Sequence, residues 1–469
     1  MTVTSDQIDA WRAEPSETPH LEFKEAKTSF NQQKLHRYCV ALGNEGGGHL
    51  VLGVADQLPR QVVGTTSFPN TQDTQNGLFN KLGFRVEVYE VNHSEGRIVV
   101  FKVPARPRGT AFQLDGAYWM RSGESLVVMT EDKLRSIFSE GEPDWLEEIS
   151  LNVTDAQSLV DLLDTQTFFE LIGTSYPSTR DGVIDKLLSE RLVIKTASGF
   201  SIKRLGGILL AKRLSDFDDL NRKAPRVIVY SGSNKLNTRL EKEGSKGYAV
   251  GFQGLVSFVM NQLPQNEILK DALRTSSTLL PEEAIRELIA NALIHQEFTI
   301  SGAGPLIEIY ENRLEISNPG TPLVPIERFI DGYQSRNERL SDLMRRMNIC
   351  EERSSGVDRV IHETEICQLP APEFRSDLNR TTVVVHGPRP FDAMSRTDRV
   401  RACFQHCALR WVMSEQMTNE TLRERFGLSK KQAGTASQII SATTDSGQIK
   451  LDESVGASRK YARYVPCWA

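Results

Sequence analysis

Three carboxylates and a lysine stand close together near the start of the chain. The stretch ETPHLEFKEA places Glu17 and Glu22 five positions apart, with Lys24 two residues further on. An apolar run, HLVLGV, follows a glycine triplet, and Asp56 comes just beyond its end. Carboxylate oxygens are the ligands that Mg²⁺ and Mn²⁺ prefer, and such an ion can polarise a phosphodiester and activate water. The spacing suits a metal-dependent catalytic site, and acids that face solvent at a strand edge are the alternative.

A second set of polar residues follows one face of a predicted helix in PEEAIRELIANALIHQEF. Glu287, Asn291 and His295 recur at every fourth position, so all three lie on the same side of that helix. A carboxylate and an amide one turn apart can hold Mg²⁺ through oxygen and orient water at a phosphate. Gly356, in RSSGVDRVI, starts a further helix, where backbone N–H groups favour phosphate. These motifs indicate a magnesium and phosphate site, and a solvated polar face is the alternative.

The elements that must position these residues fall into four pieces. Residues 1–140 mix predicted strands, such as HLVLGV and RIVVFKV, with the helix QKLHRYCVAL. Residues 141–215 predict a small winged-helix-like connector with a hairpin in KTASGFSI. Residues 216–390 return to helices and strands, and HGPRPFDAMSR marks a linker before residues 395–469. We therefore expect a multidomain α/β (α+β) protein that ends in a winged helix-turn-helix.

Composition and charge limit the classes of protein that this chain can belong to. Its 469 residues are too many for one core. A net charge of −5 means that any nucleic-acid surface is a local patch. CFQHC, with Cys403, His406 and Cys407, predicts a buried cysteine pair, and a metal site is the alternative. The sequence shows no signal peptide and no membrane-length apolar run, which predicts a cytoplasmic protein without a membrane partner.

The C-terminal piece carries a cluster of basic residues. NETLRERFGLSKKQAGTASQII predicts a helix, a glycine turn and a second helix. Lys430 and Lys431 would open that second helix, the end that enters a major groove in helix-turn-helix proteins. Arg459, Lys460 and Arg463 would lie on a wing and contact phosphates. The sequence therefore favours nucleic-acid binding here, and a dimerisation or lid module is the alternative.

The N-terminal motifs ETPHLEFKEA, ALGNEGGGHLVLGVAD and YWMRSG together resemble the Schlafen core, also called the AlbA_2 module, over residues 14–130. In the nuclease branch of that family, two glutamates five residues apart and an aspartate after the glycines form a metal-binding catalytic site. Other members are described only as nucleic-acid binding. The resemblance implies a nucleic-acid-acting domain whose candidate residues are Glu17, Glu22, Lys24, Asp56 and Arg121.

RELIANALIHQEF, ISNPG, SRNERL and ERSSGVDRV resemble the GHKL ATPase fold, in the divergent version that is fused to AlbA_2 modules in "RecG-like" proteins. Glu287 and Asn291 match the Glu-x-x-x-Asn helix, in which the glutamate activates water and the asparagine holds magnesium. Asn318 stands where the typical aspartate reads adenine. No GxxxxGK[ST] pattern occurs, so a helicase motor is not expected. The implied ATP contacts are Glu287, Asn291, His295, Asn318, Gly320 and Gly356.

These features predict a nucleic-acid-acting protein, and three functions remain open. The first is a metal-dependent endonuclease for RNA, tRNA or DNA with an ATP-sensing module, in stress or phage defence. The second is a non-catalytic, ATP-responsive DNA-binding transcriptional regulator, and the third is an ATP-gated scaffold. Expected cofactors are Mg²⁺ or Mn²⁺ and ATP. We also expect a homodimer, because one Schlafen-like core supplies only half of the groove that two-lobed members use for nucleic acid.

Overall fold

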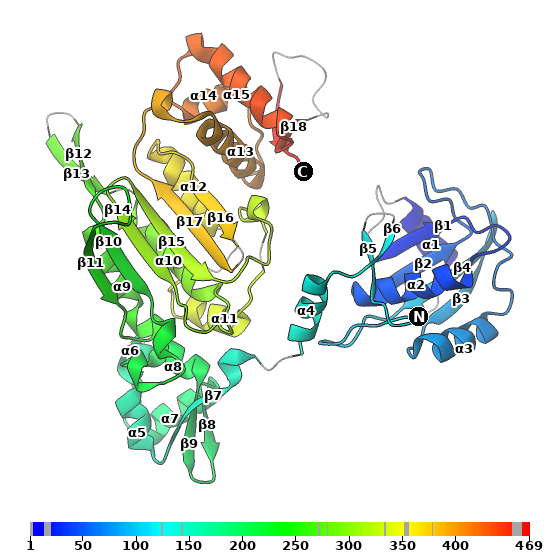
Figure 1. Cartoon of the computed structure of the whole chain (residues 1–469), viewed down its shortest axis with the longest axis horizontal. Coiled ribbons are helices and arrows are strands. Elements are labelled where there is room, and N and C mark those ends of the chain that lie inside the picture. Colours follow the sequence, from blue (N-terminus) through cyan, green and yellow to red (C-terminus); the bar gives the residue numbers. More distant parts are fainter. Residues whose placement is uncertain are drawn as a thin grey trace. The chain divides into compact units, whose positions relative to one another are not determined.

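The computed structural model of the chain has two compact units, Met1–Pro143 and Asp144–Ala469 (Figure 1). Helices and strands are mixed in both units, so the predicted multidomain α/β class is confirmed. Among the described residues, no helix combines the length and the apolar character that a membrane crossing needs. The structure describes residues 3–13, 20–122, 125–141, 144–270, 273–278, 280–332, 334–350, 356–377, 379–452 and 462–469.

A four-stranded sheet of order β1-β2-β4-β3 forms the centre of the first unit. β1 pairs with β2 in parallel, and the other neighbouring strands are antiparallel. Side chains alternate along β2, so Leu50 and Leu52 enter one buried cluster while Val51 enters another. Both faces of the sheet are therefore covered. The elements of this unit are α1 Ser5–Arg12, β1 Leu21–Lys24, α2 Gln32–Asn44, β2 Gly48–Leu52, α3 Thr71–Leu82, β3 Glu87–His93, β4 Gly96–Val103, β5 Trp119–Ser122, β6 Ser125–Val128 and α4 Glu131–Ser139.

Helix α2 and the glycine turn after it lead the chain into β2, beside β1. Asn31 caps α2 by accepting a hydrogen bond from the Lys34 N–H, and Leu35 turns toward the core. A side chain at Gly48 would collide with the backbone of His20, so only glycine lets β2 approach the start of β1 this closely. The turn therefore lets β2 pair with β1, with Leu21 opposite His49.

The second unit begins with a small helical region around the three-stranded sheet β7-β9-β8. Its β8–β9 hairpin is the one predicted in KTASGFSI. Its buried side chains belong to the same apolar cluster as those of the larger sheet that follows. The region is therefore packed onto its neighbour. Its elements are η1 Trp145–Glu147, β7 Ile149–Val153, α5 Ala156–Leu162, α6 Thr165–Leu171, α7 Arg180–Ser189, β8 Val193–Thr196, β9 Gly199–Lys203 and α8 Arg204–Leu210.

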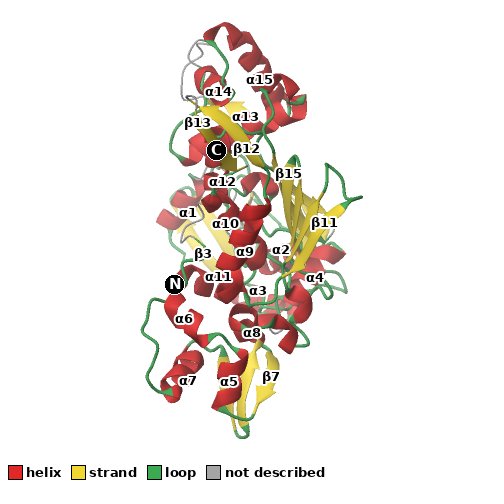
Figure 2. Cartoon of the chain, turned by 90° about the vertical axis from the view of Figure 1, so that its left-hand side faces the viewer, coloured by secondary structure: helices red, strands yellow, loops and turns green. Residues whose placement is uncertain are grey.

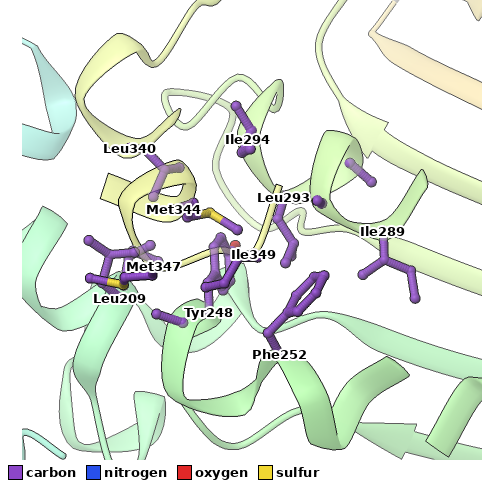
Figure 3. Close-up of a cluster of buried hydrophobic side chains, with 14 of the residues drawn as sticks. Leu209, Tyr248, Phe252, Ile289, Leu293, Ile294, Leu340, Met344, Met347 and Ile349 are labelled. Carbon is purple, nitrogen blue, oxygen red and sulfur yellow. The ribbon is translucent and has the colours of Figure 1, made fainter. Parts of the chain in front are cut away.

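A six-stranded sheet of order β11-β10-β14-β15-β17-β16 follows, and α9, α10 and α12 lie beside it (Figures 1 and 2). One buried core contains Leu209 of α8, Tyr248 and Phe252 of α9, Leu293 of α10 and Met344 of α11 (Figure 3). The elements are η2 Leu214–Asp216, η3 Asn221–Lys223, β10 Arg226–Tyr230, β11 Thr238–Glu243, α9 Tyr248–Gln262, β12 Gln265–Lys270, β13 Leu273–Thr278, α10 Glu282–Ile294, β14 Leu306–Tyr310, β15 Arg313–Pro319, η4 Ile326–Arg328, α11 Glu338–Arg346, α12 Gly356–Ile366, β16 Glu373–Asp377 and β17 Arg380–His386.

The C-terminal region has three helices and a two-stranded ribbon, and its own buried cluster. The residues Lys430–Gln432 were predicted to open the second helix of the turn, but they form a separate 3-10 turn before α15. The side chains of Ser429 and Gln432 cap that turn and hold it in the tighter conformation. The elements are η5 Phe391–Ala393, α13 Arg396–Val412, α14 Asn419–Arg425, η6 Lys430–Gln432, α15 Ala433–Asp445, β18 Ile449–Leu451 and β19 Tyr464–Pro466.

Candidate functional sites

Glu22 and Asp56 share one ammonium group in the first unit. The Lys24 Nζ lies 2.9 Å from Glu22 Oε1 and 2.6 Å from Asp56 Oδ2. Glu22 lies in β1 and is only 2% exposed, because both faces of the sheet are covered. The alternative of a solvent-facing acid is therefore wrong for Glu22, whereas the Asp56 side chain is 43% exposed. Glu17 lies outside the described residues.

Arg121 completes this buried network from β5. Its Nη1 lies 3.0 Å from Glu22 Oε2, and its Nε lies 2.8 Å from a carboxylate oxygen of Glu45. The guanidinium is thus held between two acids, and its side chain is only 10% exposed. Nucleic-acid contact by Arg121 stays a prediction. The pairing of Arg121 with Glu45 is not indicated by any local pattern, since 76 positions separate the two residues.

Charge balance decides what this network can hold. Burial alone would lower the pKa of Lys24, but its hydrogen bonds to Asp56 and Glu22 outweigh burial and raise that pKa. Burial and the nearby Glu22 charge raise the pKa of Tyr38 to about 12, so its hydroxyl stays protonated. Lys24 therefore remains a cation between the two carboxylates.

The cations of this network occupy positions that matter for the predicted metal site. No group of three metal-ligating side chains occurs within the part of the chain that the structure describes. Glu22 already meets a cation on each oxygen, and Asp56 shares Lys24 with it. Lys24 occupies the place between the two carboxylates, so a divalent cation would have to displace its ammonium group.

A pocket of about 300 Å³ opens in the second unit beside α10 and α12. Five of the predicted ATP contacts line it, and they come from three separate stretches of the chain: Glu287, Asn291, His295, Asn318 and Gly356. The sixth, Gly320, is not among the lining residues. It has a positive φ of +102°, and a Cβ there would lie 2.7 Å from the Cβ of Glu297. Close packing therefore accounts for this glycine.

Glu287 lies at the point where α10 meets the first residue of α12. Its Oε1 accepts a hydrogen bond of 3.2 Å from the Asn291 Nδ2, one turn along the helix. A Cβ on Gly356 would overlap the Glu287 carboxylate, so a larger residue at the start of α12 would displace that side chain. Burial raises the pKa of Glu287, although Asn291 and Arg359 oppose the change. A carboxylate with a raised pKa is suited to accept a proton.

His295 marks the true end of α10. The predicted helix extended through HQEF, but α10 ends at Ile294, and His295 is its C-cap. The buried Gln296 side chain donates to the Leu293 carbonyl, and the Asn337 amide donates to the Ile294 carbonyl. These side chains satisfy carbonyl groups that a longer helix would have used. Burial lowers the pKa of His295 to about 4, so the imidazole is neutral near pH 7.

Asn318 is 7% exposed and belongs to β15. Its Nδ2 donates to the Pro319 carbonyl at 3.2 Å and to the His295 carbonyl at 3.4 Å. The amide nitrogen is therefore used by the backbone, and the amide oxygen is the atom that can accept a hydrogen bond from a ligand.

For several residues that line the pocket, the sequence analysis predicted no role. Arg336 lines the pocket and forms an ion pair with Glu297, which precedes β14. Arg345 and Asp342, also in the lining, pair with each other on α11. The motif SRNERL contains Arg336, and it was the one sequence feature that could have pointed to these pocket residues. The apolar part of the lining includes Leu323, Val324, Phe329 and Val357.

The C-terminal basic residues are only partly described. Lys430 and Lys431 are exposed, and Arg463 donates to Gln416 at 2.8 Å. Arg459 and Lys460 lie outside the described residues. DNA contact by this region stays a prediction.

The cysteines of CFQHC are buried in α13, as the first interpretation expected. The Cys403 Sγ contacts the Met417 Sδ at 3.9 Å. His406 lies 2.9 Å from a Glu365 carboxylate oxygen. His406 is thus engaged by an acid of α12, and among the described residues no group of three metal-ligating side chains forms here.

Two family models match the chain. Residues 17–130 match the model described as "Schlafen, AlbA_2". Residues 302–385 match HATPase_c_4, described as "Putative ATP-dependent DNA helicase recG C-terminal". The two domain resemblances are thereby confirmed: the chain carries an AlbA_2 domain and a RecG-like, ATPase-like domain, and it is a nucleic-acid-related protein.

Two solved structures are similar to the chain at low identity. The crystal structure of the DIP2311 protein from Corynebacterium diphtheriae is 17% identical, with 92% of each chain covered and a TM-score of 0.43. The N-terminal domain of a RecG-related protein from Nitrosomonas europaea is 21% identical over 27% of this chain and 92% of that one, with a TM-score of 0.21. No curated protein matches the chain.

Proposed function

We propose that this protein binds nucleic acid and that ATP, bound in the pocket beside α10 and α12, controls that binding. The observation that carries the proposal is the meeting of Glu287, Asn291 and Gly356 at one wall of a pocket of about 300 Å³. A pocket with a few convergent polar groups among apolar side chains is the usual form of a small-molecule site. The matching ATPase-like model supports ATP as the ligand.

Different residues of the pocket are suited to bind different parts of a nucleotide. Asn291 donates to Glu287 through its nitrogen, so its oxygen is the atom suited to a magnesium ion that accompanies the phosphates. Such an ion would neutralise phosphate charge. Glu287, with its raised pKa, would take the proton of an attacking water if ATP is hydrolysed. The start of α12 at Gly356 offers backbone N–H groups to phosphate.

Helix α12 supplies a route from the pocket to the C-terminal region. The helix starts against Glu287, and near its other end Glu365 pairs with the Nδ1 of His406 at 2.9 Å and the Nε of Arg425 at 3.3 Å. Arg425 is almost fully buried and also donates to the Leu369 carbonyl. A ligand that moves the start of α12 would therefore change the packing of α13 and α14.

Calorimetric titration with Mg·ATP tests the pocket. The parent protein should bind; Asn291→Ala should weaken binding, and Glu287→Gln should keep binding but slow any hydrolysis. Asn92→Ala, at an exposed position in β3, is the matched control and should change nothing. Absence of ATP binding by the parent protein would refute the proposal.

Control of nucleic-acid binding is tested by fluorescence anisotropy with labelled RNA and DNA, with and without saturating ATP. The two affinities should differ, and nucleic acid should change ATP affinity by the same factor. Glu365→Gln should reduce that factor while ATP affinity alone stays near the parent value. Equal nucleic-acid affinities with and without ATP would leave binding intact and rule out the control.

A metal-dependent nuclease is the second candidate function. The closeness of Glu22 and Asp56 and the AlbA_2 match favour it, since both residues stand at the positions that the family resemblance assigns to catalysis. Purified protein should cut tRNA, single-stranded RNA or duplex DNA in Mn²⁺ but not in EDTA. Asp56→Asn should abolish cleavage, and Asp115→Asn, at another exposed acid of the same unit, should not. Equal cleavage by both variants would contradict this site.

A further inference from the structure

Two exposed cations stand on α2 next to the Glu22 network. Lys34 and Arg37 are three residues apart, so they lie on the same side of the helix. Each lies over an aromatic ring: the Lys34 Nζ is 5.9 Å from the centre of the Tyr38 ring, and the Arg37 guanidinium is 4.3 Å from that of Trp119. Such stacking restricts a long side chain before any ligand arrives.

Both rings belong to the surroundings of Glu22. Tyr38 shares a hydrogen bond with Glu22, and the Lys24 Nζ lies 5.9 Å from the same ring. Trp119 lies two residues before Arg121 on β5, so the two side chains point to the same face of that strand. The two exposed cations therefore border the buried acids through one layer of aromatic side chains.

The cations of this region fall into two classes. Lys24 and Arg121 are held by the carboxylates of Glu22, Asp56 and Glu45. For Lys34 and Arg37, no carboxylate of the described residues lies within ion-pair distance. Fixed and exposed cations without an internal acid are the groups that contact phosphate in nucleic-acid complexes.

We propose that Lys34 and Arg37 form a phosphate-binding pair that holds the backbone of a nucleic acid against the Glu22–Asp56 centre. This inference rests on the proposed nucleic-acid binding and names the surface that performs it. Arg37 offers a planar fork for two phosphate oxygens, and Lys34 adds a point charge one turn earlier. Contacts of this kind position the strand and do not read its sequence.

The test compares two double variants that remove the same charge from the same unit. Lys34→Ala/Arg37→Ala is compared with Lys133→Ala/Arg135→Ala, which removes two exposed cations of α4. The probes are a labelled 20-nucleotide single-stranded RNA and a DNA duplex of the same sequence, titrated over a range of salt. The first variant should make the log K against log salt slope shallower by about 1.4 for the single strand and about 1.8 for the duplex. The α4 variant should keep the parent slope.

Each outcome decides a separate question. Parent binding with equal slopes for the two double variants would overturn the phosphate pair while nucleic-acid binding stands. Absence of parent binding to either probe would overturn both. Arg37→Lys keeps the charge and loses the fork, so it should preserve the salt slope and lower the affinity. If the salt slope became as shallow with Arg37→Lys as with Lys34→Ala/Arg37→Ala, the change would indicate local unfolding. It would contradict a contact that depends on charge.

Discussion

Two glutamates of this molecule are withdrawn from water in different ways. Glu22 lies in β1 with Lys24 on one oxygen and Arg121 on the other. Glu287 lies in α10 and accepts a hydrogen bond from the Asn291 amide, and its pKa is raised by burial. The first acid meets a cation on each oxygen, whereas the second meets a neutral amide.

The difference teaches how each acid can serve the protein. When a buried carboxylate is paired with two cations, loss of one partner leaves an uncompensated charge in the interior. A partly buried carboxylate whose pKa is raised by burial is more easily protonated, which is the property of a proton acceptor. Glu22 therefore holds Lys24 and Arg121 in place, and Glu287 is suited to proton transfer.

The strongest test of the first half of this comparison is Arg121→Ala. It leaves Glu22 with one cation and removes the only ion pair of Glu45 among the described residues, so it should lower the free energy of unfolding by about 3 kcal/mol in a urea titration. Arg108→Ala, at an exposed arginine of the same unit, should change it by less than about 0.5 kcal/mol. Equal stabilities for the two variants would show that Glu22 does not depend on Arg121.

The packing of Glu287 is tested next, with Gly356→Ala. The added methyl group overlaps the Glu287 carboxylate and would displace it, so the Kd for Mg·ATP should rise about tenfold, or about 1.4 kcal/mol. Gly434→Ala is the matched control, because a Cβ there meets nothing within 4 Å. Glu287→Ala combined with Gly356→Ala should recover binding, since it removes the colliding group. Unchanged ATP affinity in Gly356→Ala would separate Glu287 from the nucleotide site.

The stability of the protein should also change with pH because of Glu287. Because its folded pKa is raised, the folded state favours the protonated acid, and stability falls as pH rises from about the ordinary value of 4.5 through the raised pKa. Glu287→Gln should therefore be more stable than the parent above that window and equal to it below. Thermal unfolding at several pH values measures this, with Glu282→Gln at an exposed site of the same helix as control. A constant difference at all pH values would contradict the raised pKa.

Local patterns in the sequence reveal the pocket better than the buried network. Glu287 and Asn291 are neighbours because helical spacing alone brings residues four apart together. The contact between Glu22 and Arg121 joins residues 99 positions apart, and no local pattern in the sequence indicates that they lie close together in space. Glu22 alternates with apolar residues in β1, a pattern typical of a half-exposed strand, yet both faces of the sheet are covered. The end of α10 was also missed, because distant Asn337 helps to fix it.

The smallest effect is expected from Tyr38→Phe, which sharpens the comparison between the two acids. The hydroxyl of Tyr38 is a third partner of Glu22, after Lys24 and Arg121. Because both cations remain, loss of one hydrogen bond should lower the free energy of unfolding by only about 1 kcal/mol. At Glu287 the corresponding change is Asn291→Ala, which removes the amide that donates to the acid and so raises the pKa of the acid further.

Tyr118→Phe serves as the control, because the Tyr118 ring packs edge-on against Phe138 and that contact does not need the hydroxyl. Urea titrations of the three proteins, parent included, measure the difference. A loss in Tyr38→Phe as large as that in Arg121→Ala would mean that the hydroxyl, and not the pair of cations, holds Glu22 in place. It would also give the two glutamates the same kind of partner, a neutral donor, and would remove the electrostatic distinction between the two sites.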